Sequence, residues 1–308
     1  MSPDPALHTP DARRDGYGSG RIEHDSRSGR VEELDVSPVL ATPAAEQAIR
    51  SRAARFTDGK APMLATIYRI ARAGDTLSVT TAAPDGVTLE DVLGALESGT
   101  VSMSDEGIVE LATLTIRAVA AMHDLPGALT HGALNPAHIL FRRDGSVLLT
   151  GAVFADALQG LQHNREQLWR EFGVALPPSA GLPRFDQRAD VAQLGALVLA
   201  IFLRRTLTSA EYPRGIADLI GTATEKVAVS GFSASALRIW LQQALQLHTK
   251  ATLSSAVDAA HAFPEVPSNA SGRRAGAQAL QAVIRQLCGD PETGDRPAAK
   301  NAGRLRAS

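Results

Sequence analysis

The sequence has 308 residues, of which 44% are hydrophobic and 21% are charged, as is typical of a globular chain with one two-lobed domain or two modest domains. The formal net charge of −2 argues against a nucleic-acid-binding protein, which would carry a basic surplus. The longest apolar run, Leu194 to Leu203, is shorter than the roughly twenty residues of a membrane helix, and no signal peptide precedes it. We therefore expect a cytoplasmic protein without a membrane span, and its single cysteine, Cys288, excludes an internal disulfide.

The amino-terminal residues 1–29 mix Gly, Pro, Ser, Asp and Arg, a composition that predicts a disordered segment. Within this segment lies the sequence Gly16-Tyr17-Gly18-Ser19-Gly20, which could be a degenerate glycine-rich phosphate-binding loop. The third glycine of the pattern Gly-x-Gly-x-x-Gly is missing, and Arg21 stands in its place. A flexible linker is therefore the simpler interpretation.

The next part of the chain is expected to be rich in strands. Residues 30–39 and 63–81 alternate apolar with polar residues, and Gly74 divides the second stretch into a predicted hairpin. Between these stretches, residues 43–56 predict a helix. Thr42 is a suitable N-cap for it, and a proline follows in the first turn.

After Gly99 the pattern changes to that of helices. Residues 104–123 carry apolar side chains at the spacing of one helical face. Residues 187–204 predict a helix that is apolar nearly all round, which is typical of a helix buried in the middle of a domain. Further helices are predicted at residues 234–248 and 254–263.

A hairpin and an irregular stretch interrupt the helical part. Residues 139–141 and 147–149 predict two short strands, and the turn Arg143-Asp144-Gly145 between them is typical of a hairpin. Residues 151–188, with several prolines, predict an irregular stretch. A small strand-rich part followed by a larger helical part indicates an α+β chain with two lobes.

The compact domain is expected to end near Pro264. Residues 265–308 predict a polar linker, a short amphipathic helix at residues 275–287 and a basic tail. This helix could dock on its own domain or on a partner, and the sequence leaves both alternatives open.

One stretch resembles the catalytic loop of protein kinases. It reads His131-Gly132-Ala133-Leu134-Asn135-Pro136-Ala137-His138-Ile139-Leu140 and is similar to His-Arg-Asp-Leu-x-x-x-x-Asn followed by two apolar residues. Downstream, Asp190-Val191-Ala192-Gln193-Leu194-Gly195 resembles Asp-Val-x-Ser-Leu-Gly at the start of the family's buried central helix. Upstream, residues 77–89 resemble the hinge between the lobes and the beginning of the next helix. The resemblance covers roughly residues 30–264.

The resemblance implies an α+β, bilobal protein kinase-like fold. A reduced strand-rich N-lobe would span residues 30–81, and a helical C-lobe would span residues 82–264. The chain is most similar to protein kinases of the bacterial Ser/Thr type. Its many alanines and arginines, beside only four lysines, also suit a GC-rich, bacterial genome.

When the chain is aligned on this resemblance, the residues needed for phosphoryl transfer are absent. The reaction needs a proton acceptor, oxygen ligands for Mg²⁺ and a lysine on the phosphates. The proton-accepting Asp falls on Ala133, and the metal-binding Asn falls on His138, a poor ligand for a hard cation. The Asp of Asp-Phe-Gly falls on Gly151. Because no lysine precedes Lys60, the strand before the helix at residues 43–56 cannot supply the phosphate lysine.

Two structural residues of the family are kept. The resemblance implies that Asp190 accepts hydrogen bonds from the backbone of the catalytic loop and that His131 packs beneath it. A carboxylate at the head of an apolar helix needs such partners, and a helix N-terminus favours an anion. The simpler alternative is that Asp190 is a surface residue in the first turn. Glu46, the counterpart of the acid that would pair with the missing lysine, is interpreted as a solvated acid at a helix start.

Two other kinds of site have little support. His123, His131 and His138 lie close together in the sequence, but their spacing matches no paired zinc-ligand pattern, and no cysteine or carboxylate cluster completes a set. No Gly-x-Ser-x-Gly elbow supports a hydrolase. We therefore expect no catalytic, cofactor-binding or metal-binding residues.

The first functional hypothesis is a pseudokinase, a regulatory or scaffolding module that binds other signalling proteins. Such a module needs no cofactor and binds no nucleic acid. The sequence leaves its oligomeric state open. One alternative is a Ser/Thr protein kinase-type phosphotransferase that uses unconventional residues. The other is a sensor that binds ATP without Mg²⁺ and does not turn it over.

Overall fold

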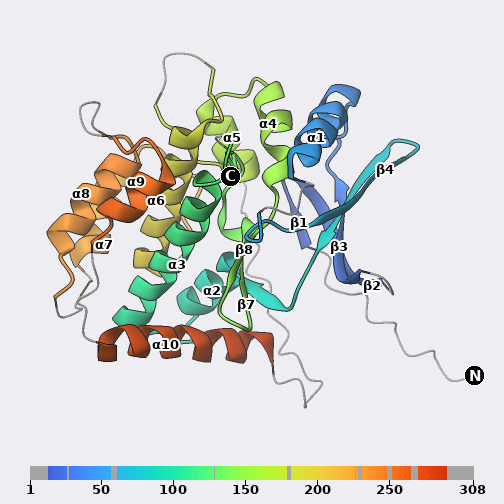
Figure 1. The fold of residues 1–308 in the computed structure, drawn as a ribbon. Coiled ribbons are helices and arrows are strands. Elements are labelled where there is room, and N and C mark those ends of the chain that lie inside the picture. Colours follow the sequence, from blue (N-terminus) through green and yellow to red (C-terminus); the bar gives the residue numbers. More distant parts are fainter. Residues whose placement is uncertain are drawn as a thin grey trace, which may run out of the picture.

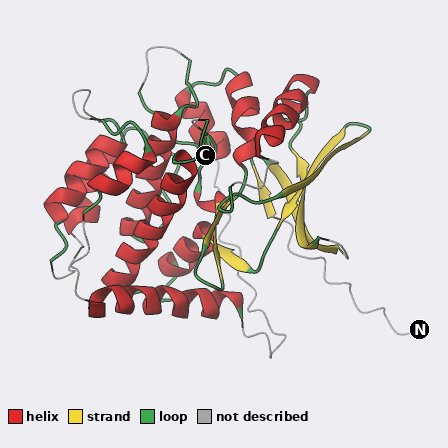
Figure 2. Ribbon diagram, in the orientation of Figure 1, coloured by secondary structure: helices red, strands yellow, loops and turns green. Residues whose placement is uncertain are grey.

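A small strand-rich lobe lies beside a larger helical lobe in the computed structural model of the chain (Figure 1). The structure describes residues 13–25, 28–56, 61–127, 129–178, 182–225, 227, 231–247, 252–264 and 270–289. The two lobes differ in content, with most of the strands in one and most of the helices in the other (Figure 2). The predicted α+β, two-lobed architecture is confirmed.

A five-stranded antiparallel sheet forms the small lobe, in the order β1-β2-β3-β5-β4. Its strands are β1 (Arg13–Asp15), β2 (Gly18–Asp25), β3 (Gly29–Val36), β4 (Ile67–Ala73) and β5 (Thr76–Ala82). Helix α1 (Pro43–Phe56) connects β3 to β4 as predicted, and the Thr42 hydroxyl caps it by accepting from the Ala45 amide at 3.2 Å.

The small lobe begins earlier than the sequence predicts. The disorder expected for residues 1–29 is wrong for residues 13–25, which form β1 and β2, whereas residues 1–12 and 26–27 lie outside the described residues. Strand β2 pairs with β3 along its whole length, from Gly18 opposite Val36 to Asp25 opposite Gly29. This ladder satisfies the backbone of a segment whose own side chains are too small and polar to indicate a strand.

A second, three-stranded sheet joins the lobes in the order β6-β7-β8. It contains β6 (Gly86–Thr88) and the predicted hairpin of β7 (Ile139–Arg142) and β8 (Val147–Leu149). Helix α2 (Leu89–Glu97) starts directly after β6, where Thr88 and Asp91 form a reciprocal capping box.

The large lobe is built around one fully buried helix. Every residue of α6 (Gln187–Leu203) from Ala189 onward is buried, as predicted for a helix that is apolar all round. Around it pack α3 (Asp105–His123), α7 (Ile216–Glu225), α8 (Ala234–Ala244) and α9 (Ala256–Ala262). Among the described residues, no helix is long and apolar enough to cross a membrane.

The stretch at residues 151–188 is more regular than predicted. It contains the 3-10 turn η2 (Ala152–Phe154) and the helices α4 (Ala155–Gly160) and α5 (Arg165–Phe172). The prediction of an irregular stretch was wrong because α5 is short and is stabilised at its ends, by a capping box at Asn164 and a left-handed Gly173. A second 3-10 turn, η1 (Pro136–His138), lies in the loop before β7.

The helix predicted at residues 275–287 is α10 (Ala270–Cys288), and it docks on its own domain. Its side chains Leu280, Val283 and Ile284 are at most 2% exposed, and α10 crosses α3 closely (Figure 1). A side chain at Gly276 would lie 2.6 Å from the Glu106 carbonyl, so only glycine fits this crossing. The packed domain therefore extends past the predicted end at Pro264, as far as Gly289.

Candidate functional site

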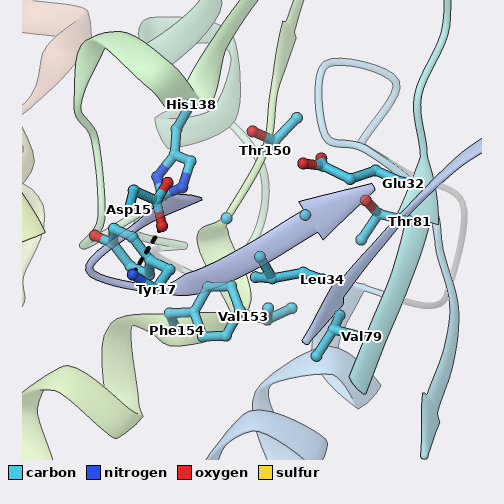
Figure 3. A pocket seen from close by; sticks show the side chains of 12 residues that line it. Asp15, Tyr17, Glu32, Leu34, Val79, Thr81, His138, Thr150, Val153 and Phe154 are labelled. Carbon is cyan, nitrogen blue, oxygen red and sulfur yellow. Dashed lines mark hydrogen bonds between the residues drawn. The ribbon is translucent and has the colours of Figure 1, made fainter. Parts of the chain in front are cut away.

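The cleft between the lobes is reduced to a cavity of about 40 Å³. Its lining comes from the small sheet, from His138 in the catalytic-loop-like segment, and from residues 150–154 (Figure 3). A single water molecule takes up roughly 30 Å³, and ligand pockets usually measure about 300 to 1,000 Å³. The cavity is therefore much smaller than a typical ligand pocket.

The side chain of Tyr17 fills most of the cleft. Tyr17 lies at the tip of the hairpin between β1 and β2 and is only 1% exposed. Its ring centroid lies 4.6 Å from that of His138, 5.3 Å from that of Phe154 and 5.4 Å from that of Phe172. All three partners belong to the large lobe, so the ring joins the two lobes by aromatic packing. Burial raises the pKa of the Tyr17 hydroxyl well above its usual value.

The backbone of the hairpin tip is fixed as well. The Asp15 carboxylate accepts a hydrogen bond from the Tyr17 amide at 2.8 Å (Figure 3). It also accepts from the Gly18 amide at 3.2 Å. A Cβ at Gly16 would lie 1.8 Å from the carbonyl oxygen of Glu171 in α5, so the chain touches the large lobe where only glycine fits. The interpretation of Gly16-Tyr17-Gly18-Ser19-Gly20 as a flexible linker was wrong. The one signal for its role was an aromatic residue within a run of glycine and serine.

His138 and Gly151, the two positions that would bind metal in a kinase, are packed against each other. The imidazole Nδ1 of His138 lies 2.6 Å from the Ala133 carbonyl, which can only accept, so Nδ1 carries a hydrogen and donates it. Gly151 has a φ of +77°. A Cβ built on it would lie 2.5 to 2.7 Å from three atoms of the imidazole, and the ring therefore excludes a side chain at position 151.

The polar groups of the cavity suit a phosphate poorly. The carboxylic acids Asp15 and Glu32 line it, and β3 presents Glu32 and Leu34 where a lysine would be needed (Figure 3). Among the described lining residues there is no lysine or arginine. The described lining therefore offers a phosphate two carboxyl groups and no basic side chain. Ala133 is fully buried and offers only a methyl group.

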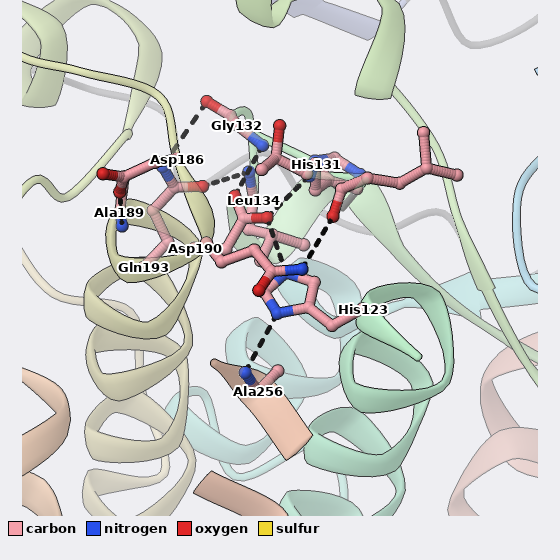
Figure 4. A network of polar contacts seen from close by, with 12 residues as sticks. His123, His131, Gly132, Leu134, Asp186, Ala189, Asp190, Gln193 and Ala256 are labelled. Atoms are coloured by element: carbon pink, nitrogen blue, oxygen red, sulfur yellow. Dashed lines mark hydrogen bonds and ion pairs between the residues drawn. The ribbon is translucent and has the colours of Figure 1, made fainter. Parts of the chain in front are cut away.

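Asp190 and His131 are brought together beneath the cleft (Figure 4). Asp190 is fully buried, so the alternative of a surface residue is wrong. Its carboxylate accepts hydrogen bonds from the amides of His131 and Gly132, each at 2.6 Å. Burial lowers the pKa of the His131 imidazole well below its usual value, with the nearby His138 and Arg52 acting in the same direction.

A third donor to Asp190 is His123, which the sequence singled out only as an unsupported metal ligand. Its Nε2 lies 2.9 Å from the Asp190 carboxylate, and its Nδ1 accepts from the Ala256 amide at 2.9 Å (Figure 4). Because Nδ1 accepts, Nε2 carries the hydrogen and donates to Asp190. Within the described part of the chain, no group of three His, Cys, Asp or Glu side chains could hold a metal ion.

Arg52 is a second bridge between the lobes, and sequence reasoning missed it. This α1 residue is 3% exposed, and burial lowers the pKa of its guanidinium. It donates to the carbonyls of Ala152 and Thr130, each at 2.5 Å, and to the Asp156 carboxylate at 2.7 Å. Nothing in the sequence distinguishes this arginine from its solvated neighbours in the helix.

Glu46 points away from the cleft. It lies in the first turn of α1 and pairs with Arg50 at 2.8 Å and with Arg72 at 2.5 Å. The hydrogen bond from Arg72, followed by that from Arg50, lowers the pKa of the Glu46 carboxyl. The Glu46 side chain is 17% exposed, so the expected solvated acid is a half-buried ion-pair residue of the small lobe.

Comparison with known proteins rests on structure alone, since no protein-family model and no curated sequence matches the chain. The kinase domain of Mycobacterium tuberculosis PknI is 17% identical, with a TM-score of 0.54 over 85% of this chain and 98% of that one. The kinase domain of maize sucrose-induced receptor kinase 1, solved with AMP-PNP, is 14% identical, with a TM-score of 0.55 over 88% and 91%. The chain therefore has a protein kinase-like fold.

Proposed function

We propose that the chain is a pseudokinase, a kinase-like domain that regulates or scaffolds other signalling proteins by binding them and transfers no phosphoryl group. The observation that carries the proposal is the burial of Tyr17 in the interlobe cleft. This ring stands where a kinase-like fold would place its nucleotide, and it contacts His138, a position from which a metal ligand would act.

The catalytic positions support the same proposal. Ala133 has no group that accepts a proton, and His138 donates its Nδ1 hydrogen to the Ala133 carbonyl. Gly151 has no side chain, and the His138 ring leaves no space for one. Loss of even one preorganised hydrogen-bond donor to the transition state commonly costs about 3 to 4 kcal/mol in barrier height. Loss of the base, the metal ligands and the lysine together argues against the phosphotransferase alternative.

The sensor alternative requires a nucleotide without Mg²⁺. Tyr17 would first have to leave a site where it packs on three aromatic rings. The nucleotide would then meet the carboxyl groups of Asp15 and Glu32, in a cavity whose described lining contains no lysine or arginine. Both costs make nucleotide binding unfavourable, so we expect no cofactor.

The two bridges between the lobes fit a scaffolding role. Arg52 binds the large lobe through backbone carbonyls and Asp156, and Tyr17 binds it through aromatic packing. A domain held in one arrangement presents a fixed surface, which lowers the entropy cost of binding a partner.

A thermal-shift titration with ATP and ATPγS, each with and without Mg²⁺, tests the proposal. A ligand that binds only the native state raises the melting temperature once its concentration passes its dissociation constant. The proposal predicts no shift up to millimolar nucleotide. A Mg²⁺-dependent shift would favour the phosphotransferase, and a shift that is indifferent to Mg²⁺ would favour the sensor.

A further inference from the structure

We infer that a groove between α1 and β4 binds an acidic linear segment of a partner protein. The inference rests on the proposed function, because it names the surface through which the module binds. The groove has a volume of about 770 Å³ and shares no lining residue with the cavity at Tyr17. It is thus a separate surface of ligand-binding size.

The walls of the groove come from three parts of the fold. The second half of α1 supplies Arg50 and Phe56, the start of β4 supplies Ile67 to Ile70, and the β7–β8 hairpin supplies Arg142 and Leu148. Apolar side chains are present in each wall. Tyr68 in β4 is 45% exposed, and tyrosine is one of the residue types enriched at protein interfaces.

The charge of the groove is of one sign. Its described lining contains Arg30, Arg50, Arg69 and Arg142 and no acidic residue. Ion pairs join Arg30 to Asp85, Arg50 to Glu46 and Arg69 to Glu33, but these carboxylates lie outside the lining. Apolar walls with arginines between them suit a segment that alternates apolar with acidic side chains.

Arg142 gives a second, independent indication of a ligand. Its Nε is buried and has no hydrogen-bond partner among the described residues. A buried N–H group without an acceptor is uncommon in folded proteins, since it has lost water and gained nothing in return. A carboxylate accepts from two guanidinium N–H groups at once, so an Asp or Glu of the partner would satisfy this donor.

The edge of the small sheet favours an extended partner. Strand β4 is the last strand in the sheet order, and among the described strands it pairs with β5 alone. The Ile70 carbonyl accepts from Arg50 at 2.9 Å, which places a guanidinium along this edge. A segment beside β4 would therefore meet both the strand edge and an arginine.

Fluorescence anisotropy with a labelled peptide that alternates glutamate and leucine tests the inference. Arg69→Glu reverses one charge of the groove. Arg170→Glu is the matched control, because both arginines have 64% exposed side chains and pair with a glutamate, but Arg170 lies on α5. We expect saturable, salt-sensitive binding to the wild type and to Arg170→Glu. Binding to Arg69→Glu should be at least about tenfold weaker, and a lysine–leucine peptide should not bind.

Arg142→Met supplies a second variant, because it removes the guanidinium whose Nε has no hydrogen-bond acceptor among the described residues and keeps most of the apolar stem. It should also weaken binding, whereas Arg214→Met, which removes an 84% exposed arginine elsewhere, should not. Failure of the glutamate–leucine peptide to saturate, or equal binding by Arg69→Glu and Arg170→Glu, would overturn the inference.

The chain's own acidic residues Asp290, Glu292 and Asp295 are a rival occupant, since Arg143 holds the carbonyl of Gly289 beside the hairpin that bears Arg142. The full-length variant Asp290→Asn, Glu292→Gln, Asp295→Asn should bind the peptide as the wild type does. Tighter binding would show that the acidic tail occupies the groove, and it would overturn the inference that a partner protein does. A melting-temperature shift of the same samples with MgATP would contradict only the proposed function. Failure of the groove inference can therefore be distinguished from failure of the pseudokinase proposal.

Discussion

The imidazole ring of His138 occupies the space in which any side chain at Gly151 would begin. Its Cε1, Nδ1 and Nε2 atoms lie 2.5 to 2.7 Å from the position of a Cβ at residue 151. The ring itself is held by the Ala133 carbonyl at 2.6 Å. His138 and Gly151 are thus adapted to each other, and a side chain cannot be restored at position 151 while the imidazole is in place.

Gly151→Asp should destabilise the domain by about 2 to 4 kcal/mol, because it combines a steric clash with a φ of +77°. The double variant Gly151→Asp, His138→Asn should be less destabilised than the sum of the two single variants, since the smaller amide removes the clash. Urea unfolding of all three measures the coupling. Additive losses of stability would show that the two side chains do not compete for space.

Tyr17→Ala should cost about 3 to 5 kcal/mol of unfolding free energy, since it removes a buried ring that packs on three others. Tyr17→Phe keeps the ring and should cost much less. Tyr68→Ala is the control, because Tyr68 is 45% exposed and lies outside the cleft. Denaturant unfolding gives all three values, and a Tyr17→Ala loss no larger than that of Tyr68→Ala would contradict the packed cleft.

Arg52→Met should cost about 3 to 5 kcal/mol, because the carbonyls of Ala152 and Thr130 would be left buried without a donor. Arg55 lies one turn later, also pairs with Asp156 and is 53% exposed. Arg55→Met should therefore cost less than about 1 kcal/mol. Hydrogen exchange should also accelerate in the backbone around Thr130 only in the Arg52 variant. Similar losses for both variants would mean that Arg52 forms no bridge between the lobes.

The stability of the domain should fall as the pH drops below about 6.5. Burial lowers the pKa of His131 from a usual value of 6.5, so the unfolded chain binds a proton that the folded chain does not. The contribution of His131 to the free energy of unfolding is complete above the pKa of this histidine in the unfolded chain. It is lost as the pH falls toward the lower pKa of His131 in the folded chain. His131→Asn, which keeps an acceptor for the Ala133 amide, should flatten the profile below pH 6.5. If stability depends on pH as steeply in His131→Asn as in the wild type, groups other than His131 cause the loss of stability.

Sequence patterns anticipated the elements with strong local signals. Helix α6 is apolar all round, and α1 has a threonine cap, so each was predicted nearly to its ends. The resemblance to protein kinases also implied that Asp190 contacts the backbone of the catalytic-loop-like segment, and the structure has this contact at residues 131 and 132. Such features depend on residues near in sequence or on a recognisable pattern.

The features that close the cleft depend on distant partners. The β1–β2 hairpin has a glycine-rich composition, and its order comes from the ladder with β3. Tyr17 and Arg52 acquire their roles from atoms of the large lobe far along the chain. No local periodicity reports such contacts, so the sequence indicated which groups were lost from the site but not what replaced them.

The most direct test of the central claim is ¹⁹F NMR of the protein labelled with 3-fluorotyrosine. The chain has three tyrosines, of which Tyr17 and Tyr212 are buried and Tyr68 is 45% exposed, and Tyr→Phe variants assign the signals. The account predicts that the Tyr17 signal is insensitive to exchange of H₂O for D₂O and is unchanged by millimolar MgATP. A Tyr17 signal that responds to solvent as Tyr68 does, or that moves when MgATP is added, would contradict a cleft filled by the protein's own side chain.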